Sequence, residues 1–212
     1  MNYLQTIARL EKRLLQPLPG FRAHQRMLAR VKEMPQQIPD SARSSAVLSL
    51  LFPHQDELHV LLIQRTEDGH AHSGQISFPG GRQDPTDADL RATALREANE
   101  EVGIMSSDVE ILGSLTQLYI PVSNFLVYPF VAFAERKPEY NLCKTEVDRV
   151  IEVPLKEILS DERKTIARVT SPADKNFVRN VNAYQLQDGS IIWGATAMIL
   201  SELEVVLAEF AR

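Results

Sequence analysis

Three glutamates on one predicted helix have the spacing of a metal site. Glu97, Glu100 and Glu101 stand at positions i, i+3 and i+4, which places their carboxylates on one face of a helix. Like charges at this spacing destabilise a helix by a few tenths of a kcal/mol per pair, roughly, and a divalent cation held between them would reverse that effect. Carboxylate oxygens are preferred ligands of Mg²⁺ and Mn²⁺. The alternative is a plain solvated helix face, which is what most acidic clusters of this kind are.

The segment before this helix favours the metal site over a solvated face. Phe78-Pro79-Gly80-Gly81 predicts a tight turn, because proline fixes one backbone angle and glycine allows conformations closed to other residues. An Asp-rich loop follows the turn. Free backbone groups of a glycine-rich turn can join side chains as ligands, so the combination suits a metal–phosphate site.

The turn and the helix together resemble the Nudix box, a motif written G-x5-E-x7-R-E-U-x-E-E-x-G-U, in which U is aliphatic. The positions that match or stand in are Gly81, Asp87, Arg96, Glu97, Glu100, Glu101 and Gly103. The first half departs from the motif twice, because Asp87 stands where the motif has glutamate and eight residues instead of seven separate it from Arg96. The role of Asp87 is therefore left open.

A second stretch narrows the resemblance to one subfamily. Residues 61–81 are similar to L-L-T-x-R-[SA]-x3-R-x3-G-x3-F-P-G-G, the additional motif of the coenzyme A pyrophosphatases within the Nudix group. The residues that match at the right spacing are Leu61, Leu62, Arg65, Gly74, Phe78, Pro79, Gly80 and Gly81. Three positions differ: Ile63 replaces Thr, Thr66 replaces Ser or Ala, and His70 replaces Arg.

The acidic helix supplies candidate metal ligands and a candidate general base. Glu97 and Glu101, one helical turn apart, are the first choice as ligands, and Glu100 is a third ligand or the base for a metal-bound water. The resemblance implies Mg²⁺ or Mn²⁺, with the carbonyl oxygen of Gly81 as a further ligand. It also implies that Arg96 orients one of the glutamates through a salt bridge.

Residues outside the acidic helix are candidates for the base and for substrate contacts. Glu146 lies where many members of the family carry a further acidic residue, and the alternative for it is an ordinary exposed strand residue. Arg65 and Arg82 could grip phosphate through planar, multi-donor contacts. The subfamily motif adds the candidate substrate contacts His70, Gly74, Phe78 and Gly80. For Phe78, a place in the core is the favoured interpretation.

The resemblance implies a metal-dependent hydrolase that cleaves the diphosphate of coenzyme A or its derivatives into 3′,5′-ADP and 4′-phosphopantetheine, or its acylated form. A diphosphate is anionic and resists attack by water, so its hydrolysis requires cations, an oriented water and a base. Two alternatives stay open. The departures at Ile63 and His70 leave room for another nucleoside diphosphate derivative, such as ADP-ribose, NADH or a dinucleoside polyphosphate. A catalytically silent Nudix-fold sensor is disfavoured, because all three glutamates of the box are present.

Composition excludes several other classes of protein. The chain has 212 residues, 44% of them hydrophobic, and a net charge of −5, which suits a sizeable core and not a nucleic-acid-binding surface. Its single cysteine, Cys143, cannot form an internal disulfide and fits a reducing compartment. A secretory signal and an apolar run of about 18 residues are both absent. We therefore expect a cytoplasmic protein that acts on a small molecule, without membrane or nucleic-acid partners. Whether it forms a homodimer is left open.

The predicted elements alternate between strands and helices, which indicates an α/β fold. Residues 1–42 form an N-terminal helical segment and linker, with helices at 2–15 and 23–33 and a Pro-rich stretch from 35 to 45, and residues 43–212 form the Nudix domain. Within that domain we expect a hairpin at 46–63 and the acidic helix at 88–102, ended by Gly103. Further strands are predicted near 109–118, 125–134, 146–153 and 178–186, with helices near 155–160 and 194–211. The resemblance implies a Nudix α/β/α sandwich with a mixed β-sheet.

Overall fold

A mixed β-sheet forms the centre of the molecule in the computed structural model, which describes residues 3–28, 37–67, 73–171 and 174–210. Its strands are β1 (Arg43–His54), β2 (Glu57–Arg65), β3 (Ile76–Ser77), β4 (Gly80–Arg82), β5 (Glu110–Ser114), β6 (Leu118–Ile120), β7 (Phe125–Phe133) and β8 (Val147–Pro154). The order is β3-β2-β1-β7-β5, with β8 paired to β2, β4 to β1 and β6 to β7. Among these described strands β1 and β7 run parallel and the other pairs run antiparallel, so the sheet is mixed as predicted.

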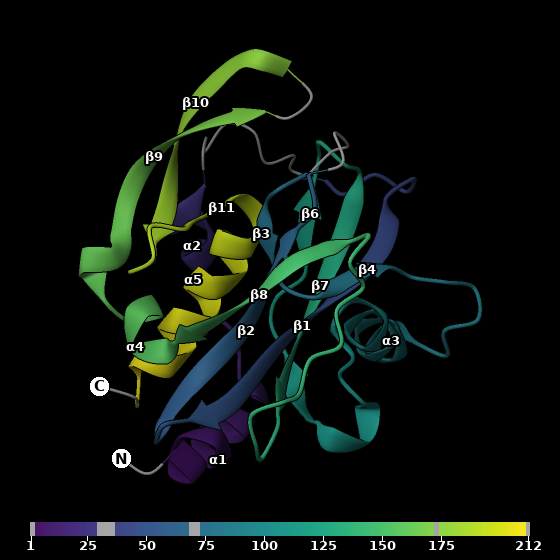
Figure 1. Cartoon of the computed structure of the whole chain (residues 1–212), viewed down its shortest axis with the longest axis vertical. Coiled ribbons are helices and arrows are strands. Elements are labelled where there is room, and N and C mark those ends of the chain that lie inside the picture. Colours follow the sequence, from purple (N-terminus) through teal and green to yellow (C-terminus); the bar gives the residue numbers. More distant parts are fainter. Residues whose placement is uncertain (1–2, 29–36, 68–72, 172–173, 211–212) are drawn as a thin grey trace.

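Helices cover both faces of this sheet (Figure 1). They are α1 (Tyr3–Leu14), α2 (Phe21–His24), α3 (Leu90–Val102), α4 (Leu155–Ile158) and α5 (Gly194–Ala208), with 3₁₀ turns η1 (Gln25–Met27), η3 (Ser106–Asp108) and η4 (Asp161–Arg163). Successive side chains of a strand point to opposite faces, and the apolar runs of β1 and β2 therefore feed two separate cores. Leu48, Leu50 and Phe52 pack with α3, whereas Leu51 packs with the core that contains α1 and α5. The predicted α/β sandwich is confirmed.

The sequence located most of the elements, and the long strand β9 is the main exception. The hairpin, the acidic helix, the strands at β5, β7, β8 and β10 (Asp174–Gln185) and the C-terminal helix all lie where they were predicted. The second N-terminal helix ends earlier than predicted, at Met27, because Leu28 has an extended backbone; residues 29–33 of the predicted range lie outside the described residues. Strand β9 (Lys164–Ser171) was not predicted, because its charged and polar residues carry only a weak apolar alternation. None of the helices in the described ranges is long and apolar enough to cross a membrane.

A second, three-stranded sheet has the order β11-β10-β9, with β11 at Ile191–Trp193. Its long β9–β10 hairpin arches above α5 in Figure 1, and β11 leads directly into that helix. The Thr196 hydroxyl in the first turn of α5 donates a 3.0 Å hydrogen bond to the carbonyl of Ile76 in β3. This bond fixes the small sheet against the edge of the large one.

The N-terminal segment is tied to α5 through one buried carboxylate. Glu202 is fully buried and accepts hydrogen bonds from the backbone N–H of Gly20 at 2.8 Å and from the backbone and hydroxyl of Thr116 at 2.9 and 2.6 Å, while the ring of His24 lies 3.1 Å away. Burial raises the pKa of Glu202, but the hydrogen bonds from His24, Thr116 and Gly20 outweigh it, so the pKa lies below its ordinary value. The ionised form is therefore the stabilising one.

Replacing Glu202 by glutamine should lower the free energy of unfolding by about 2–4 kcal/mol at pH 7, because buried donors lose a charged acceptor. Since the folded pKa is depressed, this stabilisation is present above the ordinary carboxylate pKa and is lost as the pH falls through the folded value. Urea unfolding of both proteins at pH 7 and pH 4 measures the difference. The control is Glu209→Gln, whose exposed pair with Arg13 should be worth less than about 1 kcal/mol; equal losses in the two variants would contradict the prediction.

Candidate active site

Helix α3 begins and ends where its local sequence dictates. The Asp89 side chain accepts a 2.7 Å hydrogen bond from the backbone N–H of Ala92, which caps the first turn. Gly103 adopts the left-handed conformation, with φ of 78°, and ends the helix as predicted. The helix thus starts at Leu90, two residues later than predicted, because the cap lies at Asp89.

Two of the three box glutamates point into the glycine turn. Glu101 is 1% exposed, and its carboxylate accepts a 2.9 Å hydrogen bond from the backbone N–H of Gly80 and lies 3.0 Å from the guanidinium of Arg65. Glu97 lies so close to Gly81 that a Cβ on that glycine would sit 2.5 Å from the carboxylate carbon. Both glycines belong to β4, which pairs with β1 in the main sheet. The sheet therefore holds the turn rigidly against the acidic helix.

The electrostatics of this turn favour a bound cation. Burial raises the pKa of Glu101 to about 7, although the Gly80 N–H and Arg65 oppose the shift. Burial also raises the pKa of Glu97, against the opposing effect of Arg96, and the charges of neighbouring glutamates add to the shift. Two buried or largely buried carboxylates that lack enough compensating positive charge are typical of functional sites. A divalent cation at this position would supply that charge.

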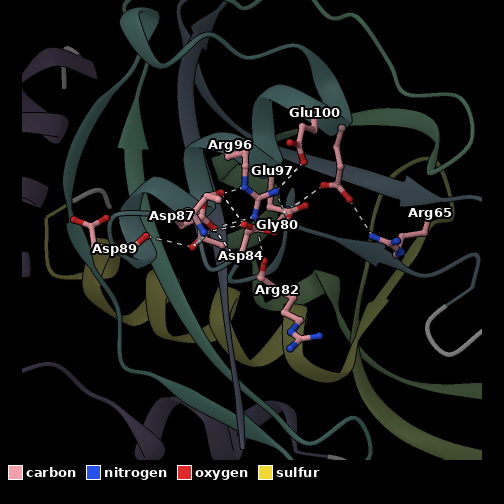
Figure 2. A network of polar contacts seen from close by, with 12 residues as sticks. Arg65, Gly80, Arg82, Asp84, Asp87, Asp89, Arg96, Glu97 and Glu100 are labelled. Carbon is pink, nitrogen blue, oxygen red and sulfur yellow. Dashed lines mark hydrogen bonds and ion pairs between the residues drawn. The ribbon is translucent and has the colours of Figure 1, made fainter.

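Arg96 organises the rest of the acidic helix, as Figure 2 shows. Its guanidinium lies 2.9 Å from the carboxylate of Glu97 and 2.8 Å from that of Glu100, so the predicted salt bridge to a glutamate is present. The other edge of the same guanidinium forms two bonds to Asp87, of 2.9 and 3.0 Å. Asp87 therefore reaches Arg96 from the turn before α3, and the longer spacing in the sequence does not separate them.

Asp87 is held as a permanent anion. Its pKa lies well below the ordinary range, first because of the bonds from Arg96 and further because of the N–H of Asp84 and the hydroxyl of Thr93, which together outweigh burial. The loop itself is ordered by Asp84, whose carboxylate accepts bonds from the backbone and hydroxyl of Thr86 at 2.8 and 2.6 Å. The sequence showed an Asp-rich loop but did not indicate which of Asp84, Asp87 and Asp89 contacts Arg96. That contact depends on how the loop folds against α3.

Replacing Asp87 by asparagine should lower turnover by about 10- to 100-fold, the effect usual for a residue that orients a metal ligand. The reason is that one face of the Arg96 guanidinium loses its anion, and Arg96 in turn positions Glu97. Steady-state kinetics with a diphosphate substrate measure the effect, and Asp108→Asn, at an exposed 3₁₀ turn, is the control. Unchanged kcat in the Asp87 variant would show that Arg96 is positioned by other contacts.

The donor set of the turn fits Mg²⁺ or Mn²⁺. Within the described ranges no three His, Cys, Asp or Glu side chains converge on one point, so the side chains do not form a cage by themselves. Mg²⁺ does not require one, because it keeps several waters and takes one or two carboxylates together with substrate phosphates. Glu97 and Glu101 can supply the carboxylates, and the backbone of Gly81 lies directly beside Glu97. All these donors are hard oxygen atoms, as these ions prefer.

Three further predicted site residues, Glu100, Glu146 and Arg82, lie at the exposed edge of the acidic cluster. The side chain of Glu100 is 58% exposed at the outer edge of α3. Glu146 is exposed, yet it lies near enough to Glu97 and Glu101 to raise the pKa of both. The backbone carbonyl of Arg82 accepts a 3.1 Å bond from Arg96, and its side chain is exposed.

Two residues of the subfamily motif, Gly74 and Phe78, have structural roles. Gly74 has a φ of 68° and closes a loop by donating its N–H to Thr66 at 3.2 Å. Phe78 is 2% exposed and packs in the core that contains α5. The favoured interpretation of Phe78 as a core residue is therefore confirmed, and its ring, which supports the glycine turn from within the core, is removed from the candidate substrate contacts. His70 lies outside the described residues.

Comparison with known proteins agrees with this geometry. A family model described as the NUDIX domain matches residues 42–173. A protein named as an uncharacterized Nudix hydrolase, NudL, from Pectobacterium atrosepticum is 34% identical over 79% of this chain and 84% of its own length. The protein of the same name from Photorhabdus laumondii is 36% identical over 80% and 87%.

Solved structures agree on the fold. A Nudix hydrolase from M. smegmatis, RenU, superposes with a TM-score of 0.55 at 16% identity, over 80% of this chain and 88% of its own. A Nudix hydrolase from Alicyclobacillus acidocaldarius superposes with a TM-score of 0.51 at 16% identity, over 79% and 96%. The family model and these relatives show that the chain belongs to the Nudix family of hydrolases, and the acidic helix with its glycine turn is the part of the structure that carries the family's motif.

Proposed function

We propose that this Nudix hydrolase cleaves the diphosphate of coenzyme A or a CoA derivative, with Mg²⁺ or Mn²⁺ as cofactor. The products are 3′,5′-ADP and 4′-phosphopantetheine or its acylated form. One observation carries the proposal. The segment that resembles the CoA pyrophosphatase motif runs from Leu61 to the glycine turn, and two of its residues, Arg65 and Gly80, contact the same carboxylate, that of Glu101. The subfamily motif and the Nudix box are therefore parts of one site.

The residues of this site suit hydrolysis of an anhydride. Glu97 and Glu101 would hold a Mg²⁺ or Mn²⁺ ion, which would polarise the phosphoryl oxygens and neutralise their charge. Arg96 fixes Glu97 in place for this role. A water attacks one phosphorus, the P–O–P bond breaks, and the leaving phosphate takes the bonding electrons. Glu100 and Glu146 are the two candidate bases for that water, since both are exposed at the rim of the acidic cluster.

Arg65 is suited to the substrate as well as to Glu101. Its side chain is 31% exposed, so part of the guanidinium faces solvent while one nitrogen holds the carboxylate. A guanidinium has five donors and can bind a phosphate oxygen with those that remain. From this position the Arg65 guanidinium can contact the carboxylate of Glu101 and a phosphate of the substrate at the same time.

The test is hydrolysis of CoA by the purified protein with Mg²⁺ or Mn²⁺, with the products separated by chromatography and identified by mass. Release of 3′,5′-ADP and phosphopantetheine in equal amounts is the expected result. ADP-ribose, NADH and a dinucleoside polyphosphate are assayed in parallel. If CoA stays intact while one of these is cleaved, the substrate proposal is wrong and the family assignment stands. A protein inert on all of them would favour a sensor.

A further inference from the structure

A cleft of about 870 Å³ lies between the main sheet and the three-stranded sheet. Its volume is in the range that holds a nucleotide-sized ligand. Its walls come from the end of β2, from β3, from the start of β8 and from β9 and β11, and they include Gln64, Arg149, Arg168, Thr170, Ser190 and Trp193. Gln64 occupies a variable position of the subfamily motif, the other five lie outside both motifs, and the site described above uses none of the six.

The cleft adjoins the metal site through two shared segments. Gln64 lines the cleft, and its neighbour Arg65 holds Glu101 on the other face of the sheet. Consecutive Cα atoms are about 3.8 Å apart, so the two sites meet at the same strand end. Gly74 to Ile76 also line the cleft, and the chain runs from there directly into the glycine turn. A ligand with its diphosphate at Glu97 and Glu101 can therefore extend into the cleft around this edge.

Arg149 is fixed at the wall of the cleft. Its Nε donates to the Gln64 side chain at 2.7 Å, one terminal nitrogen donates to the Ser190 hydroxyl at 2.9 Å, and the other lies 3.3 Å from Asp188. Its side chain is still 46% exposed. A guanidinium that is oriented by its neighbours and still faces solvent loses little freedom when it binds an anion.

Arg168 adds a second positive charge from the opposite wall, on β9. It is exposed, and its side chain has no ion pair or hydrogen bond to any other residue that the structure describes. The lining holds one acidic residue, Glu67, and Asp188 pairs with Arg149 beside it. Arg168 is therefore the positive charge of the cleft that has no ion pair within the described residues, and it is the group most available to an anion.

Trp193 supplies an aromatic surface in the same cleft. It lies in β11 directly before α5, and the bond from Thr196 to Ile76 anchors this corner to the main sheet. It is partly exposed and is the single tryptophan of the chain. A rigid, half-exposed indole is well suited to stacking against a nucleobase, which contributes as much as several polar contacts.

We infer that this cleft binds the nucleoside half of the substrate, with the base against Trp193 and with Arg149 and Arg168 around an additional phosphate on the ribose. This inference rests on the proposed function and deepens it, because it names the part of the substrate that selects CoA-type molecules. A nucleoside diphosphate derivative without the additional phosphate leaves Arg168 without an anion and Arg149 with only its contacts to Gln64, Ser190 and Asp188. The cleft, and not the acidic helix, then decides the substrate class.

The test compares binding of 3′,5′-ADP and 5′-AMP, which differ only in the additional phosphate. Neither contains an anhydride bond, so neither is consumed, and both are titrated in the same Mg²⁺ buffer. Trp193 fluorescence reports occupancy directly, and calorimetry gives the affinities. The wild-type protein should bind 3′,5′-ADP about 10- to 100-fold more tightly than AMP, as expected for charge-assisted hydrogen bonds to one phosphate. Fluorescence should change with both nucleotides at saturation.

Arg168→Gln is the cleanest variant, because this side chain has no partner to lose among the described residues. It should lower the affinity for 3′,5′-ADP at least about tenfold and leave that for AMP unchanged. Arg149→Lys, which keeps the charge and loses the planar fork, should give a smaller loss. The matched control is Arg9→Gln on the exposed face of α1, which should change neither affinity.

The outcomes separate this inference from the proposed function. Equal affinities for the two nucleotides, or an Arg168 variant that keeps the wild-type preference, would overturn the inference even if CoA is hydrolysed. A strong preference for 3′,5′-ADP that Arg168→Gln removes would support it even if CoA is not a substrate, in which case only the proposed reaction fails. Fluorescence that responds to 4′-phosphopantetheine and not to 3′,5′-ADP would assign the cleft to the other half of CoA and overturn the inference as well.

Discussion

Replacing Glu101 by glutamine is expected to lower kcat by about 10³-fold while the protein stays folded. Glutamine keeps the shape of the side chain and can still accept the Gly80 N–H, but it cannot neutralise a divalent cation. Loss of several kcal/mol of charge stabilisation in the transition state corresponds to a rate loss of this size. Turnover of CoA at saturating Mg²⁺ and Mn²⁺ measures the effect, and calorimetric titration with Mn²⁺ measures the loss of metal binding.

Stability separates this effect from simple misfolding. Glu101 is almost fully buried, and burial raises its pKa to about 7, so its charge is costly to the folded state. The uncharged amide carries no such cost, and the free energy of unfolding should therefore not fall. The control is Glu110→Gln on the exposed start of β5, which should change neither turnover nor stability. A Glu101 variant with undiminished turnover would overturn the metal assignment.

Replacing each of the two neighbouring glycines of the turn by alanine should affect different properties: Gly80→Ala mainly folding stability, and Gly81→Ala mainly turnover. At Gly80, which has a φ of 154°, a Cβ would meet the backbone carbonyl of Ala46 and lie 2.6 Å from the Cα of Val47. Backbone in a paired strand cannot move aside, so Gly80→Ala should cost about 3 kcal/mol or more of folding stability. At Gly81 the Cβ would instead meet the carboxylate of Glu97, at 2.5 to 2.6 Å.

The end of a side chain can move, and Gly81→Ala should therefore fold with a loss of only about 1–2 kcal/mol. The moved carboxylate is the candidate metal ligand, however, and a displacement of about 1 Å is enough to lower turnover by about 10²-fold. Urea unfolding and kcat are measured for both variants. The control is Gly189→Ala, where a Cβ meets nothing within 4 Å but the φ is 85°, so it should cost about 1 kcal/mol of stability and leave kcat unchanged. If Gly81→Ala retained full activity, the position of the Glu97 carboxylate beside Gly81 would not matter for turnover, and the assignment of Glu97 as a metal ligand would be contradicted.

Local features of the fold were predictable from the sequence. The turn between β1 and β2 has positive φ at Gln55 and Asp56, 51° and 62°, as a two-residue hairpin requires, and the apolar runs on either side predicted that hairpin. Helix α3 was predictable because its periodicity and its final Gly103 lie within one short stretch. Strands β9 and β11 were not, because their partners in the small sheet, and not their own sequences, decide that they are strands.

The candidate site also has features that were predictable from the sequence and features that were not. The face shared by Glu97, Glu100 and Glu101 followed from their spacing, because helix geometry is local. The contact of Arg65 with Glu101 joins residues 36 positions apart and depends on how β2 packs beside α3. The sequence therefore indicated Arg65 as a phosphate contact but not as a partner of the buried carboxylate.

The sequence by itself determined the family, the acidic face and the glycine turn, since each is written in residues that are close together along the chain. Only the tertiary structure decided that Asp87 completes the site by holding Arg96. It alone brought Arg149 and Arg168 to opposite walls of one cleft. The physical reason is that such contacts join strands and loops whose relative positions are set by packing of the whole sheet, which no short stretch of sequence encodes.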